Sequence, residues 1–160
     1  MNREAKARFG YRGMVSKKLP RRRRELLSRY GRIRSWHASL SERVDRPRGQ
    51  PPERESHASI QFEGEFTEPI RDVTRFLIQV SPTDKPDIAN ADRPNVGAFI
   101  ALRPELQGMV GMTEGHFHEL LTLAASGRLA WCHVAFTVPF RRSALIVSIS
   151  FDTRPPDDES

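Results

Sequence analysis

The sequence predicts an α+β fold with strands and one helix in the order β-β-β-α-β-β, preceded by a largely disordered basic arm. The strands are expected to form an antiparallel sheet or a small sandwich. Two observations carry this prediction. After residue 57, short segments alternate between apolar and polar residues, which is the period of a strand. Among them lies one segment with helical spacing and recognisable helix ends.

Five segments have the character of β-strands. In the first, Ile60 and Phe62 alternate with Gln61 and Glu63, so one face is expected to be buried and the other wet. The third is apolar on both faces, which is typical of a strand in the middle of a sheet. The expected strands cover residues 57–67, 74–81, 96–102, 130–138 and 145–151.

The helix between the third and fourth strands is the best-marked element. Thr113 is a favourable N-cap residue, and Glu114 lies in the first turn, where the helix dipole favours a carboxylate. Gly127 suits the left-handed residue that follows many helices. The apolar stripe of this helix should pack on the sheet and consists of Phe117, Leu120, Leu121 and Ala124.

The last two strands are expected to form a hairpin with a defined register. Pairing Phe136 with Leu145 places the alternating apolar residues of both strands on one side of the sheet. A shift by one residue would destroy that arrangement. The same register places His133 opposite Ser148 on the outer face.

Charge divides the chain. Residues 1–56 carry 17 basic and 6 acidic residues and are predicted to be a mostly disordered arm, with a marginal helix over 21–37. Residues 57–153 are predicted to be the folded domain, and 154–160 an acidic tail. Because residues 57–160 carry 9 basic and 14 acidic residues, the sequence pI of about 10.2 is a property of the arm.

Two interpretations of the arm stay open. Guanidinium groups that neutralise phosphates would give it a salt-dependent affinity for nucleic acid, and a basic membrane-surface helix is a variant of this idea. The chain also has 22 Arg against 4 Lys throughout, a bias that fits a segment without selected function or one that is merely solubilising. The candidate nucleic-acid-binding residues are Arg21, Arg22, Arg23, Arg24, Arg29, Arg32 and Arg34.

Cysteine content and hydropathy limit the cellular location that the sequence predicts. The single cysteine, Cys132, cannot form an internal disulfide, which favours a reducing compartment, and a cytoplasmic protein is expected. The longest apolar run, 96–102, is far shorter than a membrane span, so no transmembrane segment is expected. No cofactor-binding motif and no metal-ligand set is recognised in the sequence.

One constellation raises the hypothesis of a hydrolase-like site. His133 is expected opposite Ser148, with Ser150 diagonal to it and Asp152 at the strand end. A nucleophilic serine needs an exposed, strained turn and an oxyanion hole, which a flat strand does not provide. The site would also need the loop 82–95 to fold over this face. No catalytic residue is therefore assigned, and an enzyme is the third of three hypotheses.

An apolar cluster is expected on the outer face of the sheet. One helix cannot cover both faces of a sheet, so this face is predicted to bind a protein partner or a second copy of the chain. The leading hypothesis is a non-enzymatic accessory or interaction protein, and the alternative is a nucleic-acid-binding protein that uses the arginine-rich arm. The candidate partner-binding residues are Trp131, Ala135, Ile146, Leu77 and Phe99.

Overall fold

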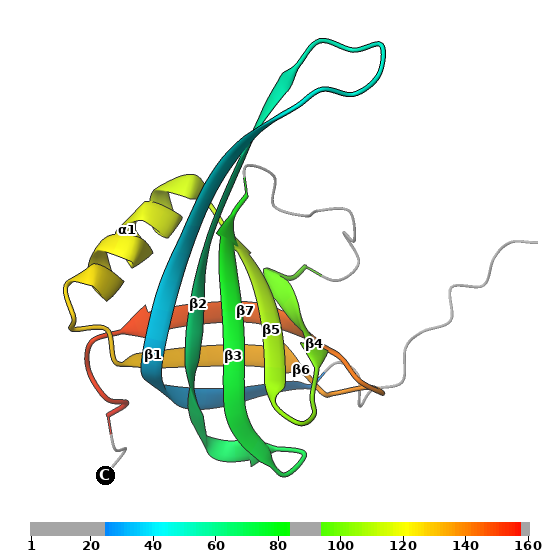
Figure 1. The fold of residues 1–160 in the computed structure, drawn as a ribbon. Coiled ribbons are helices and arrows are strands. Elements are labelled where there is room, and N and C mark those ends of the chain that lie inside the picture. The colour runs from blue at the N-terminus through cyan, green and yellow to red at the C-terminus, as the bar shows by residue number, and fades with distance from the viewer. Residues whose placement is uncertain (1–24, 84–93, 158–160) are drawn as a thin grey trace, which may run out of the picture.

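Seven strands and one helix are seen in the structure, a computed structural model that describes residues 25–83 and 94–157 (Figure 1). The strands are β1 (Leu26–Asp45), β2 (Glu53–Ile70), β3 (Val73–Pro82), β4 (Gly97–Ala101), β5 (Leu106–Met112), β6 (Trp131–Thr137) and β7 (Ala144–Asp152), and the helix is α1 (Glu114–Ala125). The strands form a closed barrel in the order β1-β2-β3-β5-β4-β7-β6, in which β6 pairs with β1.

The prediction of an open sheet or sandwich is therefore wrong, and so is the extent of the basic arm. β1 and the start of β2 lie within residues 1–56, and residues 26–37 are extended where a marginal helix is predicted from the sequence. β1 pairs with β6 along its first part and with β2 further on. Because β1 joins the two ends of the sheet, the barrel closes only with this strand in place.

Neighbouring strands are antiparallel except β3 and β5, which are parallel. After β3 the chain first forms β4, which is two positions away from β3 in the sheet. It then returns as β5, which fills the position between them and gives the parallel pair. Residues 106–112, which form β5, are not among the strands predicted from the sequence. β5 completes the wall between β3 and β4.

The barrel interior is filled by apolar side chains. Phe62, Phe76, Phe99 and Phe136 are all fully buried. The rings of Phe99 and Phe136 meet edge to face, with centroids 5.6 Å apart. The inward face predicted for residues 57–67 is confirmed, because its alternate apolar residues belong to this core, and Phe76, Ile78 and Val80 of β3 belong to it as well. The interior is a hydrophobic core, so binding surfaces have to be sought on the outside.

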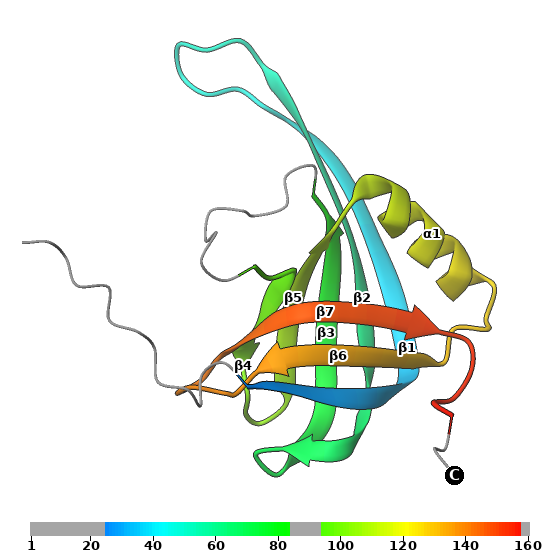
Figure 2. The same ribbon diagram turned by 180° about the vertical axis from the view of Figure 1, so that it is seen from behind.

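The predicted helix is confirmed. α1 begins after the N-cap residue Thr113, and Gly127 follows its end with φ +74°. Its buried residues Phe117, Leu120 and Ala124 belong to the main core. The helix packs over one end of the barrel, the end from which β1 and β2 extend (Figure 2).

The predicted hairpin of the last two strands exists, but its register is wrong. Phe136 pairs with Ile146 instead of Leu145, and Ala135 pairs with Ser148. The residue of β7 between these two partners has no pairing partner on β6, and this extra residue forms a β-bulge. A bulge changes which residues of its strand point inward. Accordingly, the core side of β7 is made by Ala144 and Ile146 before the bulge and by Ile149 and Phe151 after it.

Candidate functional site

Beyond the barrel, β1 and β2 continue as a two-stranded ribbon, residues 35–59 (Figure 1). The pairing of β6 with β1 ends at Arg32, and that of β3 with β2 ends at Ile60. Within the described residues, both outer edges of the ribbon therefore lack a neighbouring strand. A two-stranded ribbon is only marginally stable in water, and a free edge is a template for another strand.

One face of the ribbon is apolar and continues the barrel interior. Trp36 lies opposite the core residue Phe62, and Leu40 lies opposite Ala58 further out. Leu40 is 72% exposed and Val44 is 67% exposed. A stripe of this kind is an exposed apolar surface, the type of surface on which proteins commonly bind partners. The alternation of apolar residues from Trp36 to Leu40 is the sequence signal that points to this strand.

The ribbon is electrically balanced. Arg43 contacts Glu55 on the opposite strand, with Nη2 and Oε2 2.6 Å apart. The hydrogen bond from Arg43 holds the pKa of Glu55 below its ordinary value, and the same bond raises the pKa of Arg43. The four arginines and four carboxylates of the ribbon are Arg43, Arg46, Arg48, Arg54, Glu42, Asp45, Glu53 and Glu55. A neutral ribbon offers no general attraction to a polyanion.

Two of the five residues predicted on an exposed partner-binding face are buried instead. Phe99 and Ile146 are fully buried in the barrel core. For Ile146 the reason is the bulge in β7, which turns it inward. For Phe99 the reason is the barrel itself, because β4 turns that side chain toward the core.

The other three predicted residues are half-buried on the outside of the barrel. Trp131 and Ala135 lie on β6, whereas Leu77 lies on β3. In the closed sheet β1 and β2 separate these strands on one side, and β5, β4 and β7 separate them on the other. Leu77 therefore does not share a patch with Trp131, and the single predicted patch is not assembled. Partner binding by Trp131 and Ala135 stays a prediction.

The surface around His133 is a pocket of about 360 Å³. The ring of His133 packs against that of Tyr30 in a tilted arrangement, with ring centroids 4.5 Å apart. It lies opposite Ser150, not Ser148 as predicted, and within the described residues no hydrogen bond joins it to either serine. The carboxylate of Asp152 accepts a backbone N–H from the following turn at 2.9 Å. The serine–histidine contact that a hydrolase site needs is therefore not made here.

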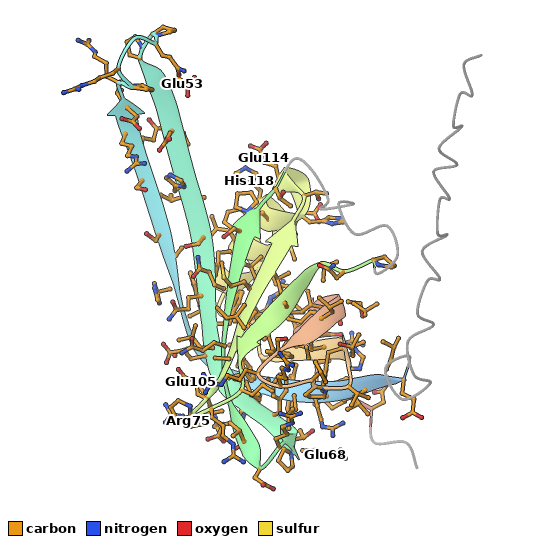
Figure 3. The ribbon with its side chains drawn as sticks, turned by 90° about the vertical axis from the view of Figure 1, so that its right-hand side faces the viewer. Glu53, Glu68, Arg75, Glu105, Glu114 and His118 are labelled. Carbon is orange, nitrogen blue, oxygen red and sulfur yellow. The ribbon has the colours of Figure 1, made fainter. Side chains whose placement is uncertain are left out.

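The histidines outside this pocket form no metal-binding set with other described residues. In the parts of the chain that the structure describes, no group of three or more His, Cys, Asp or Glu could hold a metal ion. On α1, Nε2 of His118 lies 3.7 Å from Oε1 of Glu114, one turn earlier (Figure 3). Across the same described ranges, no helix has the length and apolarity required to cross a membrane.

The arginines proposed for nucleic-acid binding divide into two groups. Arg29 and Arg34 lie on β1 and face carboxylates on β2, at 3.7 Å from Glu68 and 3.5 Å from Glu65 respectively. Arg32 is exposed on the same strand, opposite Glu65 in the β1–β2 register. These neighbours compensate the positive charge that a polyanion would contact. Arg21, Arg22, Arg23 and Arg24 lie outside the described residues.

Charge is distributed unevenly along the chain. The described residues carry 14 basic and 14 acidic residues, whereas residues 1–24 carry ten basic residues and one acidic residue. The net charge of +6 therefore originates in residues 1–24. A polyanion-binding surface on the barrel has to come from a local concentration of arginines.

Cys132 is buried on β6, and burial raises the pKa of its thiol to about 12. Because the thiolate is the reactive form, we expect the native thiol at pH 8 to react with a water-soluble disulfide reagent at least about a hundredfold more slowly than in urea. Because the thiol pKa is higher in the folded protein than in the unfolded chain, the thiol contributes to stability below its unfolded pKa. This contribution is lost as the pH rises from the unfolded pKa toward 12. Rapid labelling of the folded protein would contradict this burial.

The fold and its surfaces define a small β-barrel protein with a projecting two-stranded ribbon. No protein-family model, curated protein or solved structure matches the chain. The function is therefore inferred from the geometry of the described residues.

Proposed function

We propose that this protein is a non-enzymatic interaction protein that pairs with a second copy of itself along the free edge of β1 in the ribbon. The observation that carries the proposal is an unprotected strand edge. From Ser35 to Ser41 this edge has no proline, Lys, Arg, Asp or Glu, the residues with which proteins usually guard free edges. The free edge of β2, at 53–59, begins with three charged residues, so the edge of β1 is the better suited to pairing.

A two-fold axis at Leu40 gives a self-complementary antiparallel pair. In that register Leu40 faces its own copy, and Trp36 faces Val44 of the second copy. No two like charges are directly opposite, and the apolar faces of both ribbons lie on the same side of the sheet. The paired segment, 35–45, would be roughly 35 Å long. Pairing would convert two ribbons into one four-stranded sheet, which can be stable where a two-stranded ribbon is marginal.

The charge of the ribbon supports a protein partner over a polyanion. Its four arginines are matched by four carboxylates, and Arg43 is already paired with Glu55 at 2.6 Å. A second copy carries the same balanced surface, so association of the two ribbons brings no net repulsion. Electrostatics therefore permits the contact, and the apolar stripe of Trp36, Leu40 and Val44 provides its driving force.

Replacing Leu40 with glutamate is expected to weaken self-association at least tenfold, which corresponds to about 1.4 kcal/mol. At the two-fold axis the substitution would place two carboxylates opposite each other in an apolar stripe. Sedimentation velocity on the full chain, over a wide range of protein concentration, measures the dimer dissociation constant of the wild type and the variant.

Ser41→Glu is the matched control, because it introduces the same charge one residue along the same strand but on the other face of the ribbon. It would face Ser39 of the second copy and should leave the dissociation constant within about twofold. Two results would contradict the proposal. One is a wild-type protein that stays monomeric at every concentration, and the other is equal weakening by both substitutions.

A further inference from the structure

Three turns come together at the end of the barrel opposite the ribbon. They are the β2–β3 turn, 70–73, the β4–β5 turn, 102–105, and the β6–β7 turn, 139–143. Figure 3 shows the two ends of the molecule, with Glu53 at the ribbon tip and Glu68, Arg75 and Glu105 at the opposite end. We call the second of these the arginine end, after Arg71, Arg103, Arg141 and Arg142 in its turns.

Arg71 ties two of these turns together. One of its guanidinium nitrogens donates to the carbonyl oxygen of Arg141 at 2.5 Å, and the other donates to the carbonyl oxygen of Pro139 at 2.8 Å. Arg103 reaches the same place from the third turn, donating to the carbonyl oxygen of Arg71 at 3.5 Å. The three turns are therefore linked by arginine side chains, and this linkage holds their charges together.

Two of these arginines occupy backbone conformations that glycine normally takes. Among the described residues, the non-glycine residues with positive φ are Arg71 at +48°, Asp72 at +68° and Arg141 at +56°. All three lie in the turns of the arginine end. Tight hairpin turns favour Gly or Asn at such positions. Strained residues of this kind cluster at functional sites, where surrounding contacts hold them.

The arginine end combines positive charge with an exposed ring. Its four arginines are accompanied in the same turns by Asp72, 4.0 Å from Arg103, and by Glu105, which pairs with Arg75 at 3.9 Å. Phe140 is 48% exposed, and the guanidinium carbon of Arg141 lies 5.4 Å from the centre of its ring. A surface hollow of about 560 Å³ adjoins these groups between Arg71 and Arg103.

The chain enters the barrel at this same end. Leu26, the first residue of β1, pairs with Thr137 at the end of β6, beside the β6–β7 turn (Figure 2). The preceding residues 1–24 are the most basic part of the sequence, with ten basic residues and one acidic residue. A polyanion bound at the arginine end would lie at the point where this basic segment joins the barrel.

We propose that the arginine end binds the sugar–phosphate backbone of single-stranded nucleic acid, with Phe140 providing a face on which a base stacks. Arginine guanidinium groups match phosphate in shape and charge. Proteins that bind single strands combine a positively charged surface with aromatic side chains. This surface is distinct from the ribbon and does not depend on self-association.

Single-stranded nucleic acid fits this end better than an anionic membrane does. Membrane-surface binding grows with the apolar area that is inserted, and these turns expose one phenylalanine ring together with Leu26 on the adjoining strand. A duplex would offer phosphates but no unstacked base for Phe140. Phospholipid vesicles and duplex DNA are therefore the competing ligands in the experiment.

The test compares two double variants of the full chain with equal charge changes. Arg103→Glu with Arg142→Glu alters the arginine end, and Arg46→Glu with Arg48→Glu alters the exposed ribbon tip. Binding of a fluorescent oligothymidylate is measured by anisotropy over a range of salt concentrations. The first double variant should weaken binding at least tenfold and lower the salt slope by about 1.4, as expected for two lost phosphate contacts on a single strand. The ribbon-tip variant should change affinity less than twofold.

Phe140→Ala is the second measurement. It should weaken oligothymidylate binding at least about fivefold and leave duplex binding within twofold, because only the single strand offers a base for stacking. The thermal unfolding transition reports whether Arg103→Glu disturbs folding. If it does, Phe140→Ala and Arg142→Gln still test the proposal. The proposal is overturned by equal losses in the two double variants, by an unchanged affinity in Phe140→Ala, or by binding to anionic vesicles with none to the oligonucleotide.

Discussion

Phe99→Ala is expected to destabilise the protein by about 3–5 kcal/mol. Phe99 is fully buried on β4, and its ring meets those of Phe66 and Phe136 edge to face at 6.3 and 5.6 Å. Removing the ring deletes buried apolar surface and leaves a cavity among side chains that already touch. For a chain of this size, the melting temperature should fall by roughly 6–20 °C. Urea unfolding followed by tryptophan fluorescence gives the free energy of unfolding directly.

Ile100→Ala is the matched control for this substitution. Ile100 is the next residue on β4, points to the other side of the strand and is 53% exposed. Its truncation should cost less than about 0.5 kcal/mol, as for other surface positions. If the two substitutions cost the same, β4 does not have the inside and outside faces that a closed barrel gives it.

The sequence was sufficient to predict elements whose residues carry a clear local pattern. β2 alternates apolar and polar residues over at least five positions, and in β3 the apolar residues Phe76, Ile78 and Val80 recur at every second position. These apolar faces are the ones that fill the barrel. α1 has both an N-cap residue and a glycine beyond its end, and its start and end lie where these residues predict. Such local signals arise from the chain's own periodicity and do not depend on which strand lies beside which.

β1 could not be predicted in the same way, because its inward positions do not look apolar. Leu27 and Ile33 point toward the core, but the two positions between them on the same face are Arg29 and Gly31. A Cβ at Gly31 would lie 2.6 Å from the ring of Phe76 and 3.0 Å from Sγ of Cys132, so the packing leaves no room for a side chain. In the sequence this glycine looks like an interruption of a marginal helix. Only the partners across the barrel explain it.

The candidate surfaces were predicted less well than the core, for the same reason. The bulge in β7 inverts the faces of Leu145 and Ile146, and nothing in the alternation of that segment marks it. The ribbon exists because β1 continues beyond the end of its pairing with β6, and the paired residues of these two strands lie 99 or more residues apart in the sequence. The arginine end is assembled from three separate turns. Surfaces made by distant segments need the three-dimensional arrangement before they can be recognised.

Gly64→Ala is expected to destabilise the protein by about 3 kcal/mol, the upper end of the usual cost of overpacking. Gly64 lies on β2 between Ile33 of β1 and Phe76 of β3. An added Cβ would collide with the backbone carbonyl oxygen of Arg32 and would lie 2.6 Å from the ring of Phe76. Because one obstacle is backbone, rotation of a side chain cannot relieve the collision. β1 also contains a bulge next to this pair, so the glycine lies where the strands bend out of the barrel toward the ribbon.

Gly115→Ala makes the same chemical change where space is open, since a Cβ there would have no neighbour within 4 Å. Gly115 is exposed in the first turn of α1, where alanine should stabilise the protein by up to about 1 kcal/mol. The pair of variants thus separates lost space from the general effect of replacing glycine, and both are measured by urea unfolding. If Gly64→Ala proved as harmless as Gly115→Ala, β1 would not approach β2 this closely. The closure of the barrel through β1, on which both the ribbon and the arginine end depend, would then be wrong.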